Sequence, residues 1–159
     1  MNDAAELISQ ASLGEELSRE DAAVLGGLMK FRDLADGDFL ITEGEEDDSL
    51  HVLLDGKLEV VKRSGADEMA SLAVLREGDL AGELSFIDGG VHTVGLRALC
   101  DTQVLSLTRK DFENIIDKNP QLVYKVMRAV ARSAHRIVHR MNHENIELNN
   151  YIFKQHGRY

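Results

Sequence analysis

The sequence predicts a mainly β-stranded domain with flanking helices, built as a sandwich or barrel and followed by a long C-terminal helix. Three observations support this fold class: residues 36–108 alternate short apolar runs with glycine-containing turns, the first 35 residues have a helical pattern, and no helix breaker follows Pro120 until Gly157. Many short strands at such spacing are typical of a sandwich or barrel. We expect a β-barrel body with N-terminal helices at residues 1–118, and a long helix and tail at residues 119–159.

The first 35 residues are expected to be helical throughout. Ser18 and Asp21 have the spacing of a capping box, with aspartate in the place of the usual glutamate. The apolar residues behind this cap can share one helical face: Val24, Leu25, Leu28, Met29 and Phe31. Gly26 and Gly27 weaken the helix near its end.

Six β-strands are expected in the next part of the chain. Their ranges are 38–42, 50–54, 58–62, 69–75, 93–98 and 103–107. The pair Asp55-Gly56 stands between two apolar runs, and glycine supplies the positive φ that a tight type I′ turn needs. We therefore expect the strands on either side of Gly56 to form a hairpin.

A long helix is expected from Pro120 to about Tyr151, because proline is favoured in a first helical turn and nothing breaks the helix afterwards. At about 1.5 Å per residue it would exceed ~40 Å and extend past a body of this size. Its apolar residues recur in steps of three and four, interrupted by Glu144: Met127, Val130, Ala134, Ile137, Met141, Leu148 and Tyr151. This seam predicts a parallel homodimer. The alternative is a stripe that folds back onto its own barrel.

Charge is unevenly distributed along the chain. Residues 1–110 hold 23 acidic against 10 basic side chains, and residues 111–159 hold 5 against 8. The net charge of −10 argues against direct DNA binding and against membrane association, because DNA phosphates and anionic membrane surfaces repel a negatively charged protein. The acidic run 43–48 is expected to be a solvated loop. A basic face of the long helix is expected to be solvated as well, or to contact an acidic surface: Arg128, Arg132, Arg136 and Arg140.

Several classes of protein are excluded or made improbable. No apolar run reaches the ~18–20 residues of a membrane span, and the N-terminus lacks the pattern of a signal peptide, so we expect a cytoplasmic protein. The single cysteine, Cys100, excludes an intramolecular disulfide and a cysteine-ligated zinc site. No nucleophile elbow, paired carboxylates or metal motif is present. We therefore expect no enzymatic activity, no catalytic residues and no metal site.

Residues 80–93 contain the segment with the most specific chemistry, LAGELSFIDGGVHT. Gly82 lets the backbone approach an anion, and the N–H groups that follow it point out of a helix start. Glu83 can accept a hydrogen bond from a sugar hydroxyl beside a phosphate. The segment is a candidate phosphate cradle, and the alternative is an ordinary glycine turn before a short helix.

The order of these motifs resembles the cyclic nucleotide-binding domain family, and in particular its bacterial catabolite-activator branch. The likeness covers about residues 17–141 and is carried by spaced glycines and three motifs: Gly82-Glu83-Leu84, Arg97-Ala98 and Asn119-Pro120. It implies a jelly-roll β-barrel with flanking helices and a cyclic nucleotide (cAMP or cGMP) inside the barrel. It also implies that the long helix covers the base and forms the dimer.

By this resemblance, Gly82 and the backbone of Leu84 and Ser85 would line the phosphate, and Glu83 would bind the ribose 2′-hydroxyl. Five positions before Arg97 the family has an arginine that grips the phosphate.

That position is His92 here, although Thr93 fits the hydroxyl position beside it. Arginine offers a permanent charge and a two-pronged donor, whereas histidine is mostly neutral at pH 7. The exchange is expected to cost ~1.5–3 kcal/mol of binding free energy. The family's base-reading threonine-serine pair falls on Ile137-Val138, which can pack on a purine but cannot hydrogen-bond its edge.

The sequence therefore predicts a non-enzymatic regulatory module that binds a cyclic nucleotide or a related nucleotide, such as a cyclic dinucleotide, and signals through a dimeric helix to a protein partner. The chain ends at Tyr159, where catabolite activators continue into a helix-turn-helix domain, which also argues against direct DNA binding. The alternative is a degenerate fold that no longer binds nucleotide and acts as a protein–protein interaction module. Restoring arginine at His92 would distinguish the two.

Overall fold

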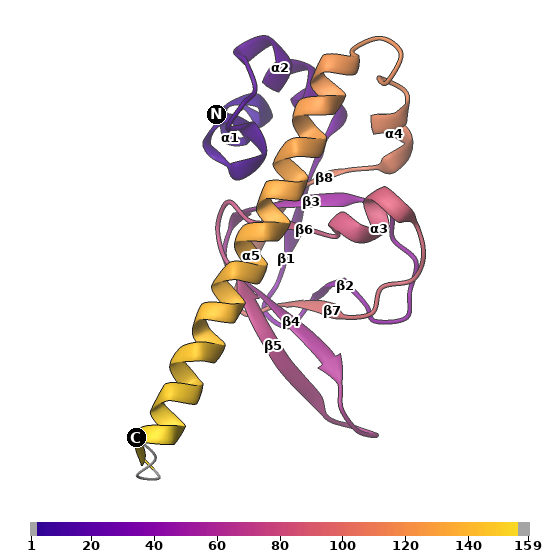
Figure 1. Cartoon of the computed structure of the whole chain (residues 1–159). Helices are drawn as coiled ribbons and strands as arrows, with labels where there is room; N and C mark the ends of the chain where they lie inside the picture. The colour runs from indigo at the N-terminus through magenta and orange to yellow at the C-terminus, as the bar shows by residue number, and fades with distance from the viewer. Residues whose placement is uncertain (1–2, 156–159) are drawn as a thin grey trace.

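Two four-stranded antiparallel sheets face each other in the computed structural model, which describes residues 3–155, without the side chains of residues 145 and 148–155 (Figure 1). The strand orders are β1-β8-β3-β6 and β2-β7-β4-β5. The strands are β1 (Lys30–Leu34), β2 (Phe39–Ile41), β3 (Leu50–Asp55), β4 (Leu58–Arg63), β5 (Met69–Leu75), β6 (Leu80–Ala81), β7 (Gly95–Ala98) and β8 (Thr102–Leu107). The mainly β jelly-roll fold with flanking helices is confirmed.

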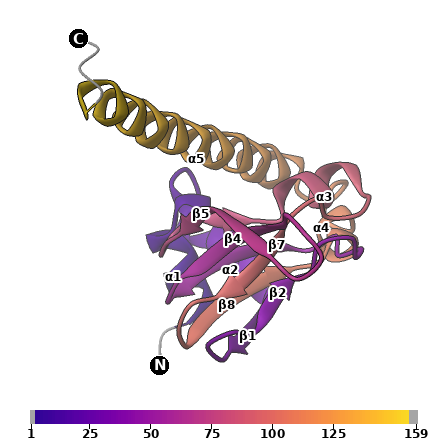
Figure 2. The same ribbon diagram turned by 90° about the horizontal axis from the view of Figure 1, so that it is seen from below.

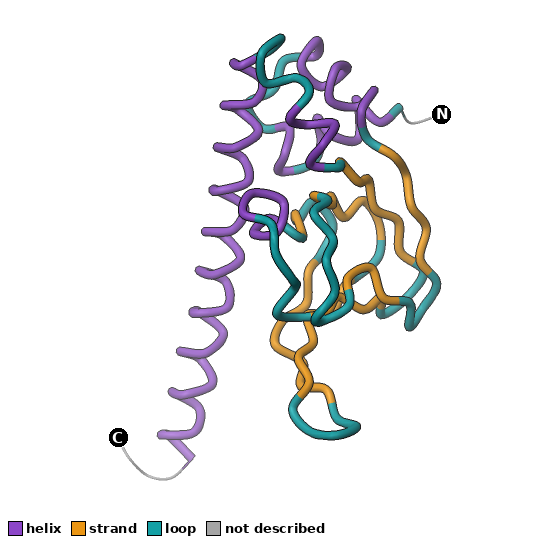
Figure 3. The backbone as a smooth tube through the Cα atoms, turned by 90° about the vertical axis from the view of Figure 1, so that its right-hand side faces the viewer, coloured by secondary structure: helices purple, strands orange, loops and turns teal. Residues whose placement is uncertain are grey.

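Helices lie at one end and along one side of this sandwich (Figures 2 and 3). They are α1 (Ala4–Gln10), the 3-10 turn η1 (Ser12–Gly14), α2 (Arg19–Leu28), α3 (Glu83–Asp88), α4 (Arg109–Glu113) and α5 (Pro120–Gln155). The capping box of α2 is confirmed, since Ser18 Oγ accepts the Asp21 N–H at 3.1 Å and the Ser18 N–H donates to the Asp21 carboxylate at 3.3 Å. No helix within residues 3–155 is long and apolar enough to cross a membrane.

Strand β3 is buried on both faces, because the helices cover the face that turns away from the second sheet. Leu50 and Val52 belong to the core beneath the helices, which also holds Leu25 and Val126. Leu53 belongs to the core between the two sheets. These two separate cores explain why the run 50–54 shows no clear alternation of apolar and polar residues.

The N-terminal prediction is wrong at its end, since α2 stops at Leu28 and residues 30–34 form strand β1. Strand β1 pairs antiparallel with β8, from Lys30 opposite Ser106 to Leu34 opposite Thr102. The hydrogen bonds of this edge pairing outweigh the local helical pattern, which is a weak preference by comparison.

The hairpin expected at Asp55-Gly56 is also wrong, although Gly56 does have a positive φ of 98°. Strand β3 pairs with β6 and β8, whereas β4 pairs with β5 and β7, so this turn crosses from one sheet to the other. A Cβ on Gly56 would lie 2.4 Å from Thr102 Oγ1. The turn therefore packs closely against the start of β8. Its sequence specifies a tight turn, but it does not specify with which strands β3 and β4 pair.

Helix α5 runs along the body and continues beyond it (Figure 1). Two residues of α5 face the body: Val130 is buried in the core beneath the helices, and Ile137 packs against the core between the sheets. The first half of the helix therefore packs onto its own body, as the alternative interpretation of the seam proposed. Glu144 is exposed, and the side chains of Leu148 and Tyr151 lie outside the described residues.

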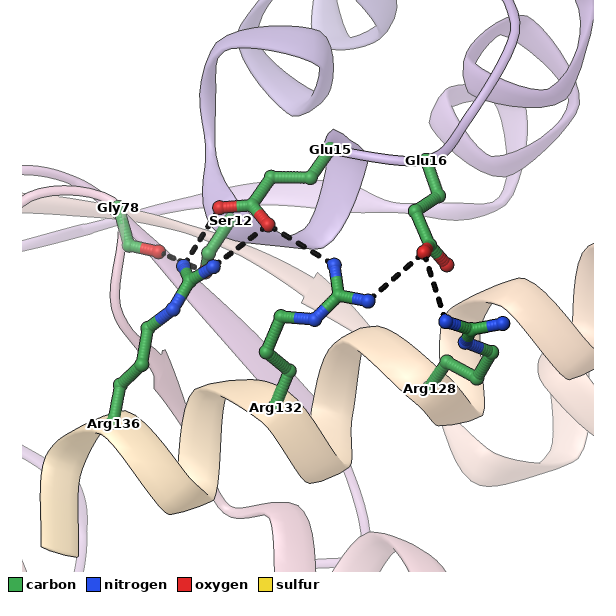
Figure 4. A network of polar contacts seen from close by, with 7 residues as sticks. All are labelled: Ser12, Glu15, Glu16, Gly78, Arg128, Arg132 and Arg136. Atoms are coloured by element: carbon green, nitrogen blue, oxygen red, sulfur yellow. Dashed lines mark hydrogen bonds and ion pairs between the residues drawn. The ribbon is translucent and has the colours of Figure 1, made fainter. Parts of the chain in front are cut away.

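The basic face of α5 contacts acidic residues of the same chain, so of the two interpretations the solvated one is wrong and contact with an acidic surface is what the structure shows (Figure 4). The Glu15 carboxylate accepts hydrogen bonds from Arg136 at 2.6 and 2.8 Å and from Arg132 at 3.2 Å. Glu16 binds Arg132 at 2.8 Å and Arg128 at 3.2 Å. These arginines lower the pKa of both carboxyl groups. They attach α5 to the segment between η1 and α2.

Candidate functional site

A cavity of about 360 Å³ lies between α3, the inner faces of the sheets and α5. Its apolar wall includes Ile41, Val60, Leu75, Leu80, Leu96 and Ile137. Its polar wall is formed mainly by the segment predicted from the sequence: Gly82, Glu83, Ser85, Asp88, His92 and Thr93. A larger hollow of about 610 Å³ elsewhere is lined by Asp33, Asp38, Asp55 and Asp101 among others, and it lacks an apolar wall of this kind.

Gly82 makes the close turn from β6 into α3. Its φ is 79°, and a Cβ at this position would lie 2.7 Å from the Ser49 carbonyl oxygen. Both facts require glycine, because other residues rarely adopt this backbone conformation and would clash with the neighbouring strand. Glycine is therefore needed here for the close packing against Ser49, and the approach of this backbone to an anion stays a prediction.

The first turn of α3 places two polar side chains on the cavity wall. Glu83 is partly buried, and this burial raises the pKa of its carboxyl group, with the negative charge of Asp79 adding to the effect. Ser85 is buried, whereas the side chain of Leu84 is 79% exposed. The backbone and not the side chain of Leu84 is thus the part that a ligand in the cavity could contact.

His92 is buried and bound on both sides of its ring. Its Nε2 lies 2.7 Å from the carbonyl oxygen of Asp47, and a carbonyl only accepts, so Nε2 carries a proton and donates. Its Nδ1 lies 3.3 Å from Ser85 Oγ. Its backbone N–H donates to the Glu45 carbonyl at 3.0 Å, and its carbonyl accepts the Gly44 N–H at 2.8 Å. His92 therefore joins the acidic loop 43–48 to α3.

Asp47 is a residue of this region that the sequence reasoning missed, because the run 43–48 was expected to be solvated. Its Oδ2 lies 3.2 Å from Nε2 of the fully buried His51, whose Nδ1 lies 2.7 Å from Ser106 Oγ. The hydrogen bond from His51 lowers the pKa of Asp47 to about 2. The spacing of four residues between Asp47 and His51 was the available signal, and alone it is too common to identify a contact.

The two residues expected to face a base are placed differently. Ile137 lies on the cavity wall, whereas the side chain of Val138 is 55% exposed and is not among the described residues of that wall. One helical turn beyond Ile137, Arg140 binds Asp79 at 2.8 Å. Helix α5 is thus both part of the cavity and attached to its rim.

The wall suits a ring and a hydroxyl group better than a cyclic phosphate. Its apolar side chains can pack on a flat ring, and Glu83 can accept a hydrogen bond from a hydroxyl. Among the described residues that line the cavity there is no lysine or arginine, and the charged ones are Glu83 and Asp88. The residues present therefore do not fit the anionic part of a cyclic nucleotide.

Comparisons with known proteins point to one family. Residues 31–119 match the family model of the cyclic nucleotide-binding domain. The CRP-like cAMP-activated global transcriptional regulator of Mycobacterium tuberculosis is 24% identical over 131 residues, which are 82% of this chain. The chain spans 58% of the length of that relative.

Solved structures agree with this match. The N-terminal domain of a transcriptional regulator from Streptomyces coelicolor A3(2) is 32% identical with a TM-score of 0.71, covering 82% of this chain and 93% of that one. A cyclic nucleotide-binding domain from Methylobacillus flagellatus KT is 22% identical with a TM-score of 0.79, covering 91% of this chain and 82% of that one. By its matched residues and its fold, this chain belongs to the cyclic nucleotide-binding domain family and is CRP-like.

Proposed function

We propose that this chain is a non-enzymatic regulatory module that binds a small ligand of nucleoside or nucleotide size and signals through α5 to a protein partner. The observation that supports this best is the composition of the cavity wall, which contains both the α3 segment with Glu83 and Ile137 of α5. A ligand in the cavity contacts α3 and α5 together. It can therefore favour one position of α5 over another by binding the two arrangements with different affinity.

The ion pair between Arg140 and Asp79 couples the ligand site to α5 in this proposal. Asp79 directly precedes Leu80 of the cavity wall and lies four positions before Glu83, and its negative charge contributes to the raised pKa of the Glu83 carboxyl. A ligand that binds Glu83 changes the electrostatic surroundings of Asp79, and hence its attraction for Arg140. The C-terminal part of α5 continues past the body (Figure 1), so a change in how α5 is attached alters where that part lies relative to the body.

The proposed signalling form is a parallel homodimer through α5. Apolar residues on the flank of α5 that turns away from the arginines recur in steps of three and four: Ala131, Ala134, Val138 and Met141. Val138 is 55% exposed. This seam is rotated from the one read from the sequence, because Val130 and Ile137 already pack against the body.

Thermal melting with a ligand panel tests the proposal: cAMP, cGMP, cyclic dinucleotides and the corresponding nucleosides. A ligand at about 100 times its Kd adds about 2.7 kcal/mol to the free energy of unfolding, which raises Tm by several degrees. Ile137→Ala should reduce the shift, and the adjacent Val138→Ala, outside the described cavity wall, should leave it unchanged. A cooperative melt that no compound shifts contradicts the proposal.

A second candidate function is a protein–protein interaction module in which the cavity no longer binds a ligand. The engagement of His92 by Asp47 and Ser85 favours it, because the position that grips phosphate in relatives is used here for internal packing. This candidate predicts that His92→Arg gains no affinity for cAMP or cGMP. The leading proposal predicts a gain, since the cavity beside the new arginine is open.

A further inference from the structure

The described residues that line the cavity beside α3 include no lysine or arginine. Glu83 and Asp88 are its charged residues in the part of the chain that the structure describes. Lys62 lies outside the cavity wall, and its Nζ donates to the backbone carbonyl of Thr93 at 2.9 Å. A cyclic phosphate is an anion at neutral pH, and an anion placed beside carboxylates in a partly closed apolar cavity is destabilised unless a cation pairs with it.

His92 cannot turn its ring towards a ligand without breaking existing contacts. Its Nε2 donates to the Asp47 carbonyl at 2.7 Å, and its Nδ1 lies 3.3 Å from the Ser85 hydroxyl, so both ring nitrogens have partners. A ring that turned towards a ligand would leave the partly buried Asp47 carbonyl without this donor, which is costly. The residue that aligns with the family's arginine is therefore part of the scaffold here.

The start of α3 is a weak substitute for the missing cation. This helix has only 6 residues, and Glu83 places a carboxyl group in its first turn. Burial also raises the pKa of that carboxyl, so this corner of the cavity already disfavours negative charge. Glu83 can accept a hydrogen bond from a ligand hydroxyl, and such a hydroxyl brings no further negative charge into this corner of the cavity.

We propose that the cavity selects an uncharged ligand, a nucleoside or a similar hydroxylated ring compound, over the matching cyclic nucleotide. The apolar side chains of Val60, Leu75, Leu96 and Ile137 contact the ring, and Glu83 accepts a hydrogen bond from a sugar hydroxyl. The volume of about 360 Å³ is at the lower end of the range for small-molecule sites. This inference rests on the proposed function, because it names the ligand class of the same cavity.

Isothermal titration with matched pairs tests the selection: adenosine against cAMP, and guanosine against cGMP. The members of each pair share base and sugar, and the cyclic phosphate is what separates them. We expect one nucleoside to bind the unmodified protein, and its cyclic nucleotide to bind at least about tenfold more weakly, because no cation compensates the phosphate.

Thr93→Arg provides a gain-of-function variant that leaves the hydrogen bonds of His92 in place. Thr93 is exposed and lies on the cavity wall, so an arginine side chain can extend from there without displacing buried side chains. We expect this variant to bind the cyclic nucleotide about ten- to a hundredfold more tightly, with little change for the nucleoside. Thr93→Gln, of similar length without charge, is the control and should change neither affinity.

The outcomes separate this inference from the proposed function. Binding of cAMP or cGMP to the unmodified protein as tightly as the nucleoside overturns the inference and leaves the proposed function intact, and Lys62→Ala then tests whether Lys62 holds the phosphate. Binding of a cyclic nucleotide by Thr93→Arg, when the unmodified protein binds no nucleoside, also overturns the inference alone. If neither the unmodified protein nor a Thr93 variant binds any of the four compounds, the inference is overturned, and the proposed function is overturned with it if cyclic dinucleotides also give no thermal shift.

Discussion

Gly82 and Gly27 show how differently two glycines of one chain depend on their surroundings. Gly82 has a φ of 79° and a carbonyl oxygen 2.7 Å from where a Cβ would lie, whereas Gly27 in α2 has open space. We expect Gly82→Ala to lower the free energy of unfolding by about 2 kcal/mol or more, and Gly27→Ala to raise it by up to about 1 kcal/mol. Urea denaturation followed by circular dichroism measures both. A Gly82→Ala protein as stable as the parent would contradict the described turn.

Asp47 gives a prediction for pH. Its pKa is lowered to about 2 from the ordinary 3.8 by the hydrogen bond from His51. A carboxyl whose pKa is lower in the folded state stabilises the fold above about pH 4, and this contribution is lost as the pH falls through about 2. Because its side chain is 31% exposed, we expect Asp47→Asn to cost only about 1–2 kcal/mol at pH 7.

The difference between Asp47→Asn and the parent protein should shrink towards zero between pH 4 and pH 2, measured by urea denaturation at several pH values. Asp48→Asn is the control, because Asp48 is the exposed neighbour in the same loop. A difference that stays constant down to pH 2 would show that the Asp47 carboxylate is not held by His51.

The two flanks of helix α5 have different surroundings. The arginine flank binds Glu15 and Glu16 of the same chain, and the flank with Val138 remains exposed. We expect Val138→Glu to convert a homodimer into a monomer, because a charge at a seam position of paired helices is not compensated. Light scattering after size-exclusion chromatography gives the mass directly.

His139→Glu is the matched control for this variant, since His139 is an exposed neighbour on α5 that points away from the proposed seam. It should remain dimeric, and both variants should keep the circular dichroism spectrum of the parent. A parent protein that is monomeric at tens of micromolar would end the proposal of a homodimer through α5.

For the whole molecule, the ion pairs between α5 and the N-terminal segment decide how the helix is attached to the body (Figure 4). Single exposed ion pairs contribute little, but Glu15 and Glu16 share three arginines. We expect Glu15→Gln/Glu16→Gln to lower the urea midpoint in dilute buffer. The deficit should nearly vanish at about 1 M salt, where charges are screened beyond ~3 Å.

Glu20→Gln on α2 is the control for this pair of substitutions and should show no salt-dependent deficit. The pH dependence has a definite sign: the arginines lower the pKa of Glu15 and Glu16, so their stabilisation is present above pH 4.5 and is lost as the pH falls through the lowered values. A deficit that is independent of both salt and pH would mean that the substitutions act through packing.

Local features of the fold could be predicted because they depend on a few neighbouring residues. The strand expected at 69–75 is β5 (Met69–Leu75), and the Ser18 cap and the positive φ of Gly56 are as expected. The α3 segment was found in the same way, because its glycine turn is a local signal. Hydrophobic periodicity, helix capping and the conformational freedom of glycine each depend on residues within a few positions of one another.

The residue patterns thus predicted a sandwich or barrel, the place of the glycine turn at Gly82 and a long C-terminal helix, and the family resemblance implied the jelly roll. Three features became visible only in the folded chain: the sheets to which β3 and β4 belong, the face of α5 that is buried, and the binding of His92 to Asp47, 45 positions away. These features depend on contacts between segments that are distant in the chain. Such contacts follow from how whole elements pack, and no pattern of adjacent residues specifies them.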